Sequence, residues 1–157
     1  MTAREEPERD ALRGLGRERV LLSLPADARF GALARMCASA LASQLGFAVD
    51  EIEDLRLAVD ELVISTTAGA TPQARADLEF VFSDELLEIT CTASGVVADD
   101  DEEEPDSGDA GILPQRILSE RILDALTEAH AIERQSISTR RGWIQVRRTV
   151  GDRDARG

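Results

Sequence analysis

The stretch from Val49 to Ser65, VDEIEDLRLAVDELVIS, places the strongest constraint on the fold of this chain. Its apolar residues recur every three to four positions, which is the spacing of a long amphipathic helix. Leu57 and Ile64 add apolar surface on another side, so we expect this helix to have neighbours on more than one face. Glu61 and Ser65, four residues apart, fall together on a flank beside the main stripe. That stripe consists of Ile52, Leu55, Ala58, Val59, Leu62 and Val63.

The rest of the chain alternates between strand and helix patterns. In chain order we predict strand 19–24, helix 28–45, helix 49–67, a hairpin of strands 76–82 and 87–93, helix 114–129, and strands 131–138 and 143–150. Asp27 and Asp50 are the predicted N-caps, Gly46 ends the first helix, and Pro114 begins the third. The predicted inward faces are Phe30, Leu33, Ala34, Cys37, Leu41 and Leu45 in the first helix, and Ile117, Leu118, Ile122, Leu126 and Ala129 in the third.

Five strands joined mostly by short turns, with three helices, predict an α+β two-layer sandwich. Three helices are too few to cover both faces, so we expect them on one face of a mostly antiparallel sheet. Gly69 and Pro72 are expected to interrupt the chain before the hairpin, and Arg140-Arg141-Gly142 to form the last turn.

We expect one folded domain over residues 18–150, with polar tails at 1–17 and 151–157. Loop 97–111 carries eight carboxylates between Asp99 and Asp109, and like charges at this density oppose compaction. The acidic run has three interpretations: a solvated loop, a Ca²⁺ site, or an electrostatic attraction for a basic partner. Its spacing lacks the alternating ligands and central glycine of an EF-hand loop, which disfavours Ca²⁺.

Composition excludes several kinds of chemistry. The net charge of −13 argues against direct nucleic-acid binding, which needs a basic surface, and favours a basic protein partner. Without any lysine, the chain cannot have a P-loop lysine or use Schiff-base catalysis. Cys37 and Cys91 lie in apolar periodic segments and are interpreted as buried thiols in a reducing compartment, with a disulfide as the alternative. No stretch has the pattern of a signal peptide or a membrane span, so we expect a cytoplasmic protein.

Two motifs point to a known family. Leu24-Pro-Ala-Asp27 precedes the first predicted helix, and Asp54-Leu-Arg-Leu-Ala-Val-Asp-Glu61 lies in the second. Together with the element order, they resemble the bacterial anti-sigma factor and serine-protein kinase family of the histidine-kinase-like ATPase (gyrase, Hsp90, MutL) fold. The resemblance runs from about Val20 to Val150. It implies a cytoplasmic, commonly dimeric protein that sequesters an alternative sigma factor, often in stress responses, until an anti-anti-sigma antagonist takes its place. Many members also phosphorylate that antagonist with Mg-ATP.

The helix motif of the family's nucleotide site is altered in this chain. Glu61 stands where the family has its general base, but Ser65 replaces the asparagine that ligates Mg²⁺, and Gly69 replaces a frequent histidine. A serine oxygen is a shorter and weaker ligand, whereas Mg²⁺ demands near-octahedral geometry. Glu61 is therefore either a vestigial catalytic base or a hydrogen-bonded carboxylate on a helix flank.

The adenine and phosphate motifs are altered too. Ala93 stands where the family has the aspartate that binds adenine, and only Gly95 is kept from that motif. Losing this carboxylate removes a charge-assisted hydrogen bond of about 1.5–3 kcal/mol. Gly108 and Gly111 are what remains of the glycine-rich phosphate lid, next to an acidic run that repels triphosphate. We therefore expect weak or no ATP binding and no cofactor, with Mg-ATP as the ligand if the site still functions.

Four further residues have alternative interpretations. The resemblance makes Arg35, and less strongly Arg29, candidates for partner binding, whereas a helix-surface arginine is otherwise a solvated charge. His130, the only histidine, is placed at the end of the third helix, where a cation suits the helix dipole, and no catalytic role is expected for it. Trp143 is interpreted as a strand core residue rather than a platform for a ligand.

The sequence thus favours a binding module: an anti-sigma factor that occludes its sigma factor by direct contact and has a degenerate nucleotide site. The alternative is an active serine-protein kinase in which Ser65, with Glu61 as base, helps to hold Mg²⁺. A third possibility is that the fold serves a different partner altogether.

Overall fold

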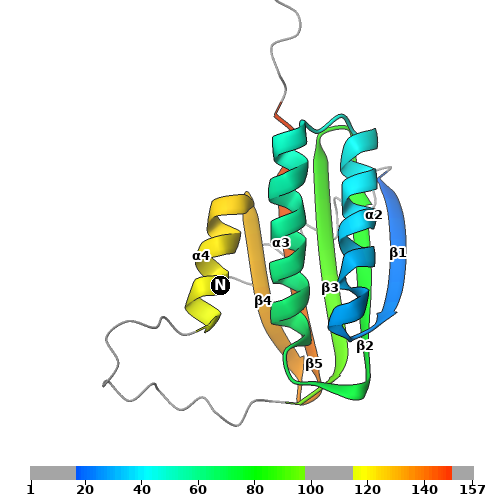
Figure 1. Ribbon diagram of the computed structural model, residues 1–157, viewed down its shortest axis with the longest axis vertical. Helices are drawn as coiled ribbons and strands as arrows, with labels where there is room; N and C mark the ends of the chain where they lie inside the picture. The colour runs from blue at the N-terminus through cyan, green and yellow to red at the C-terminus, as the bar shows by residue number, and fades with distance from the viewer. Residues whose placement is uncertain (1–16, 98–114, 150–157) are drawn as a thin grey trace, which may run out of the picture.

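The structure is a computed structural model and describes residues 17–97 and 115–149 (Figure 1). Its elements are β1 (Glu18–Pro25), a 3₁₀ turn η1 (Ala28–Phe30), α2 (Gly31–Gln44), α3 (Val49–Thr67), β2 (Ala70–Phe82), β3 (Leu86–Val96), α4 (Gln115–Leu126), β4 (Ala129–Ser136) and β5 (Thr139–Arg147). The predicted α-helices and strands are all present in these ranges, with boundaries that differ by a few residues.

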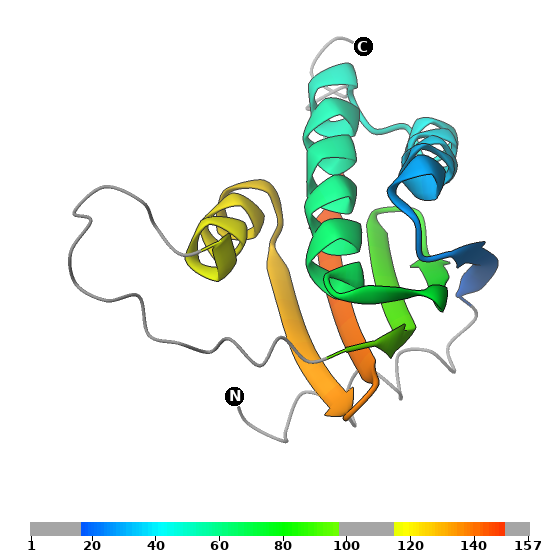
Figure 2. The same ribbon diagram turned by 60° about the horizontal axis from the view of Figure 1, so that its bottom comes forward.

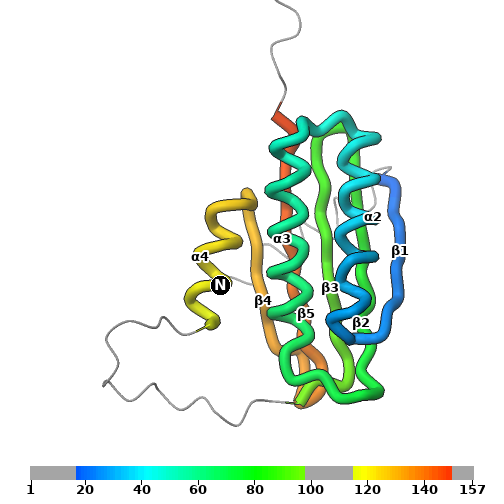
Figure 3. Tube along the Cα trace, viewed as in Figure 1, coloured from blue at the N-terminus to red at the C-terminus, as the bar shows by residue number. Residues whose placement is uncertain are grey.

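The strands form one sheet in the order β1-β2-β3-β5-β4, and every neighbouring pair is antiparallel. Among the described elements, the helices lie on one face of this sheet, with α2 and α3 side by side along the strands and α4 beside β4 (Figures 1 and 2). The tube in Figure 3 shows the same two layers. The prediction of an α+β two-layer sandwich is confirmed, and the architecture is consistent with the histidine-kinase-like ATPase fold.

Of the predicted helix caps, the one for α3 differs from the structure. Asp27 caps η1, because its carboxylate accepts a hydrogen bond from the Arg29 amide, and Gly46 follows the C-cap of α2 with φ +80°. The predicted cap of α3, Asp50, is wrong: Ala48 is the N-cap residue, and Asp50 lies in the first turn. Glu51 takes over part of the capping, because its Oε2 accepts from the Ala48 amide at 2.7 Å.

The last turn is also displaced from its predicted place. Strands β4 and β5 are joined at residues 137–138, so Arg140-Arg141-Gly142 lie within β5 rather than in a turn. The glycine serves packing instead: a Cβ atom on Gly142 would lie 2.8 Å from both Leu62 Cδ1 and Thr66 Oγ1 of α3. A strand glycine of this kind marks the close approach of another element. Pro72, likewise predicted as an interruption, lies inside β2, near its register shift.

The predicted inward face of the first helix is confirmed except at Leu33, which is exposed. The buried residues of α2 are Ala34, Ala38 and Ala42, which recur every four residues, and their small side chains let the helix lie close to its neighbours. The larger side chains on the predicted face are partly buried against the core: Phe30, Cys37, Leu41 and Leu45. Helix α3 has neighbours on more than one face, as predicted, because it contacts α2, α4 and the sheet, but Leu57 and Ile64 are exposed.

In α4 the fully buried apolar residue is Leu123, which the sequence pattern missed, and Ile117 and Leu118 are exposed. The core lies between the helices and the sheet. Its largest fully buried side chains include Leu55 and Leu62 of α3, Phe80 of β2, Ile89 of β3 and Ile144 of β5. Both cysteines are free thiols, as predicted, but only Cys91 is fully buried, and Cys37 is partly exposed. Burial raises the pKa of Cys91 to about 12. Trp143 is buried, as expected of a strand core residue, but lies outside this helix-facing cluster.

Several predictions fall outside the described residues. They are the tails apart from Arg17, the acidic run 99–109, the lid residues Gly108 and Gly111, and Pro114. Within residues 17–97 and 115–149, no helix has both the length and the apolar character needed to cross a membrane.

Replacing Gly142 with alanine should destabilise the fold. The added methyl would meet Leu62 and Thr66, both fully buried, so the α3–β5 contact has to open. We expect the free energy of unfolding, measured by urea titration, to fall by about 1–3 kcal/mol. Gly31→Ala is the matched control, because its Cβ would have no atom within 4 Å, and should be neutral or stabilising. A Gly142→Ala variant as stable as the native chain would contradict the close contact.

Candidate functional site

Glu61 lies in the last third of α3 and faces α4. Its side chain is buried, with 9% of the residue exposed. The carboxylate atom Oε1 accepts hydrogen bonds from two hydroxyls, that of Ser65 at 3.2 Å and that of Ser119 on α4. Ser65 is thus brought next to Glu61 as predicted, whereas Ser119 was not found by sequence reasoning. The bond from Ser119 joins α4 to α3 at the position where the resemblance places catalysis.

The C-terminal end of α3 is capped by an arginine from the sheet. Nη1 of Arg140 donates to the backbone oxygens of Ser65 at 3.1 Å and Ala68 at 2.9 Å. The guanidinium satisfies carbonyls that have no partner within the helix, and its charge suits the negative end of the helix dipole. Gly69 follows with φ +73°, a left-handed backbone conformation that favours glycine. Side chains along a strand alternate between its two faces, so Arg140, two residues before Gly142, faces α3 as Gly142 does.

Gly95 and Ala93 lie near the end of β3. Gly95 has φ +80°, and a Cβ atom there would lie 3.0 Å from Ala74 Cα of β2. Its amide donates to the Ser138 carbonyl at 2.9 Å. The absence of a side chain at Gly95 therefore allows β3 to pack closely against β2, next to the register shift between Ala70 and Arg75. Ala93 is fully buried, so a methyl group lies at the position that the resemblance assigns to an adenine-binding aspartate.

The described residues do not fit Mg-ATP as the family binds it. The Ser65 hydroxyl is bonded to Glu61, and Oε1 of Glu61 is shared with Ser119. Mg²⁺ needs oxygen ligands in near-octahedral geometry, and a helix serine used in this way does not replace an asparagine amide. The methyl side chain of Ala93 has no acceptor for the adenine amino group.

The two predicted partner-binding arginines lie at the start of the α2 region. Arg35 is half-buried and forms an ion pair with Asp60 of α3. Arg29 is exposed, binds both carboxylate oxygens of Asp27 at 2.9–3.1 Å, and lies over the ring of Phe30. The hydrogen bonds from Arg29 hold the pKa of Asp27 below its usual value. Both arginines therefore already have an acidic partner within the chain.

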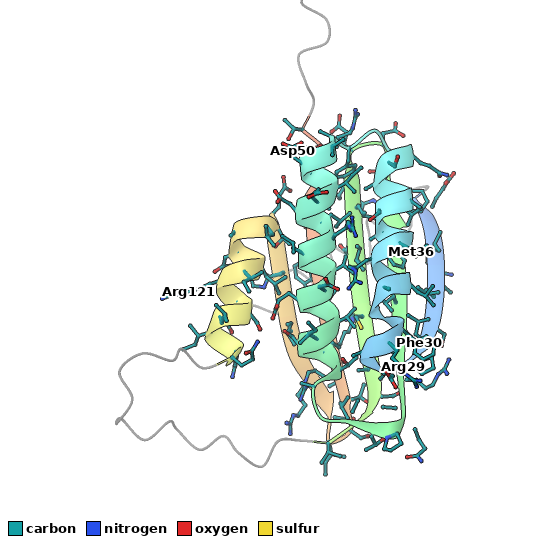
Figure 4. All side chains as sticks on the ribbon, in the orientation of Figure 1. Arg29, Phe30, Met36, Asp50 and Arg121 are labelled. Carbon is teal, nitrogen blue, oxygen red and sulfur yellow. The ribbon has the colours of Figure 1, made fainter. Side chains whose placement is uncertain are left out.

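Arg35 and Asp60 line a groove of about 390 Å³ between the start of α2 and the second half of α3. Phe30 and Ile64 contribute apolar walls, and β2 contributes Leu78 from below. Figure 4 shows Arg29 and Phe30 at the N-terminal end of α2 and Met36 further along that helix.

Large apolar side chains are exposed on the same two helices. Met36 is 66% exposed on α2, and Leu57 and Ile64 are each more than half exposed on α3. Leu33 of α2 belongs to the same set. Exposed apolar groups gathered on neighbouring helices are typical of a protein–protein contact. We call Leu33, Met36, Leu57 and Ile64 the α2–α3 apolar surface.

His130 lies on β4 rather than at the end of a helix, which corrects its predicted place. Helix α4 ends at Leu126, and β4 begins at Ala129. The Thr127 hydroxyl donates to the Leu123 carbonyl at 2.7 Å and helps to end the helix early. Nε2 of His130 lies 2.7 Å from Oδ1 of Asp124, so the histidine joins β4 to α4.

Comparison with known proteins gives a distant similarity. No family model matches the chain. It is 30% identical over 84 residues to the serine-protein kinase RsbW of Bacillus cereus (strain B4264), an alignment that covers 52% of each chain. The same values hold for serine-protein kinase RsbW of Bacillus thuringiensis (strain Al Hakam). The chain thus spans about half the length of the curated relatives it matches. The similarity supports the resemblance to the anti-sigma factor and serine-protein kinase family.

Removing the Ser119 hydroxyl should weaken the joint between α3 and α4. Ser119→Ala leaves the buried Glu61 carboxylate with one donor fewer, and we expect the free energy of unfolding to fall by about 1–3 kcal/mol. In a Glu61→Gln background the same substitution should cost less, because a neutral acceptor makes a weaker bond. Urea titrations of the four chains give the coupling. Ser43→Ala, at an exposed serine of α2, should change stability by less than about 0.5 kcal/mol. Equal costs in both backgrounds would show that the negative charge of Glu61 does not strengthen its bond to Ser119.

Proposed function

We propose that the protein is an anti-sigma factor that sequesters an alternative sigma factor by direct binding and binds ATP weakly or not at all. An anti-anti-sigma antagonist releases the sigma factor by competing for the chain. The protein acts in the cytoplasm, as a homodimer, in a stress response. The similarity to RsbW supports the class. The observation that carries the binding-only function is the buried methyl group of Ala93 at the position that the resemblance assigns to the adenine-binding aspartate.

The α2–α3 apolar surface and the neighbouring groove form the partner site in this proposal. Arginine is among the side chains that contribute most to binding free energy at interfaces, and methionine is enriched there as well. Arg35 contributes the positive charge. When the partner binds, Arg35 either leaves Asp60 for the partner or contacts the partner while it stays paired with Asp60. The net charge of −13 complements the basic surface expected of a DNA-binding partner and speeds association. For the homodimer we propose residues Val20–Leu24 of the edge strand β1.

Substitution of Arg35 tests the partner site. We expect Arg35→Ala to weaken binding of the sigma factor encoded in the same genome by tenfold or more, about 1.4 kcal/mol, measured by calorimetry. Asp60→Ala removes the same ion pair but keeps the arginine, so it should retain binding. Arg116→Ala, at an exposed arginine of α4, is the matched control for loss of a positive charge.

Two results would count against the proposal. If the chain binds no sigma factor from its own genome, the anti-sigma function is wrong. If Asp60→Ala weakens binding as much as Arg35→Ala, the ion pair supports the shape of the surface and Arg35 is not a contact.

An active serine-protein kinase is the second candidate, favoured by the name that the relatives carry. It would phosphorylate the anti-anti-sigma protein with Mg-ATP, with Glu61 as base and Ser65 near the metal. Both hydrogen bonds described for Glu61 go to Oε1, so Oε2 is the oxygen that would accept the substrate proton in this function.

Titration with Mg-ATP separates the two candidates. The binding-only function predicts no saturation below about 1 mM, equivalent to a binding free energy weaker than about 4 kcal/mol. Submillimolar affinity that is lost in Glu61→Ala and in Ser65→Ala would favour the kinase. Phosphate transfer to the antagonist protein, followed with labelled ATP, would then establish it.

A further inference from the structure

The solvent-facing side of α3 changes from acidic to apolar along the helix. At the helical repeat of about 3.6 residues per turn, its outward residues form one broad stripe opposite the side chains that enter the core. Toward the N-terminus this stripe consists of Asp50, Glu53 and Asp54, and toward the C-terminus it consists of Leu57 and Ile64. All five are exposed, the two apolar ones to 56% and 57%. The same stripe therefore offers negative charge at one end and apolar area at the other.

The apolar end of the stripe lies beside the groove between α2 and α3. Ile64 and Phe30 line this groove, which has a volume of about 390 Å³. Met36, 66% exposed, extends the apolar area onto α2. In the groove wall the charges of Arg35 and Asp60 compensate each other in an ion pair. This end of the surface therefore favours apolar contacts.

The acidic end of the stripe carries carboxylates without a compensating charge in the described structure. Figure 4 shows Asp50 at the opposite end of the helix pair from Phe30, which lines the groove. Within residues 17–97 and 115–149, neither Glu53 nor Asp54 takes part in an ion pair. Arg56 is exposed on the same helix and offsets part of this charge. Positive charge from a partner would lower the remaining repulsion between the carboxylates.

We propose that this surface binds an amphipathic helix of the partner. The apolar stripe of that helix lies over Leu57, Ile64 and Met36, and arginine or lysine side chains beside the stripe lie over Glu53 and Asp54. The helix belongs to the sequestered sigma factor, so this assignment rests on the proposed function and names the part of the partner that is bound.

The helical form of the bound segment follows from the elements that it meets. The backbone groups within α2 and α3 bond inside each helix, so an extended peptide lying across them would find no strand edge to pair with. A helix satisfies its own backbone groups and presents side chains along one face at intervals of seven residues. Leu57 and Ile64 are themselves seven residues apart, about 10.5 Å along α3. Two apolar side chains with the same spacing on a partner helix can therefore contact both.

Charge disfavours other occupants of this surface. A second copy of the chain, docked through the same stripe, would bring Glu53 and Asp54 close to their own counterparts, and each copy carries a net charge of −13. Nucleic acids and anionic membranes are repelled for the same reason. A small molecule could enter the groove but would leave Leu57 and Met36 exposed. A basic amphipathic helix matches both ends of the stripe at once.

Neutralising two carboxylates tests the acidic end. We expect Glu53→Gln/Asp54→Asn to weaken binding of the sigma factor encoded in the same genome by about tenfold at low salt, with a smaller effect as the salt concentration rises. Calorimetry at several salt concentrations measures this change. Asp84→Asn/Glu133→Gln is the matched control, because it alters the net charge equally at exposed carboxylates outside α3, and affinity should stay within about twofold. Circular dichroism checks that both variants are folded.

Truncation of one apolar side chain tests the other end. Leu57→Ala should weaken binding several-fold at every salt concentration, because apolar contacts are not screened by salt. Its exposed side chain contributes little to the core, so the variant should remain folded. Ile137→Ala is the control, since this residue is 85% exposed between β4 and β5 and lies outside the proposed surface.

Two synthetic helical peptides separate failure of this assignment from failure of the proposed function. Both carry the same leucine stripe, flanked by arginine in one peptide and by glutamate in the other. We expect the basic peptide to bind at least tenfold more tightly, to shift the amide resonances of α2 and α3, and to lose affinity in Glu53→Gln/Asp54→Asn. If it does so while no sigma factor binds, the proposed function is wrong and the surface assignment stands. The assignment is overturned if both doubly neutralised chains bind the sigma factor equally well, or if the basic peptide binds no better than the acidic one.

Discussion

The close packing of α3 on β5 is the contact on which the rest of the structure depends. It is possible because Gly142 has no side chain at the point where Leu62 and Thr66 reach the sheet. Thr66 is fully buried there, and its hydroxyl donates to the Leu62 carbonyl, which avoids an unsatisfied polar group. With α3 fixed at this depth, the flank that carries Glu61 faces α4, and the C-terminal carbonyls of the helix come within reach of Arg140.

The polar groups of α3 serve as structural joints in the region where the resemblance would place phosphate transfer. Ser119 connects Glu61 to α4, and Arg140 connects the helix end to β5. Both bonds of this joint go to Oε1 of Glu61, whereas a general base would use Oε2 for the substrate proton, so the structural role stands by itself. The observed bonds therefore explain why a buried glutamate is retained without requiring it to act as a base.

Sequence periodicity predicted the elements and the two-layer fold, because amphipathic helices and alternating strands need only local patterns. It failed where the deciding contact is distant. Gly142 was taken for a turn residue, since its packing against Leu62 cannot be seen locally. Ser119 bonds to Glu61 across 58 positions, so no spacing rule finds it. Strand β5 has buried residues on both of its faces. An alternating pattern therefore cannot show on which face of the sheet Trp143 lies.

If the site binds no ATP, release of a sequestered partner has to follow mass action alone. An antagonist that binds the same α2–α3 surface shifts the equilibrium only by its own concentration relative to its dissociation constant. A tenfold change in free antagonist then changes the competition by about 1.4 kcal/mol at most. Such a switch responds to antagonist abundance or to its modification by another kinase. A surface used by two competing partners must stay accessible, which agrees with exposed Met36, Leu57 and Ile64 on the helix side. Burial of Trp143 and Val81 on the opposite face removes a second apolar surface that would otherwise compete for the same partners.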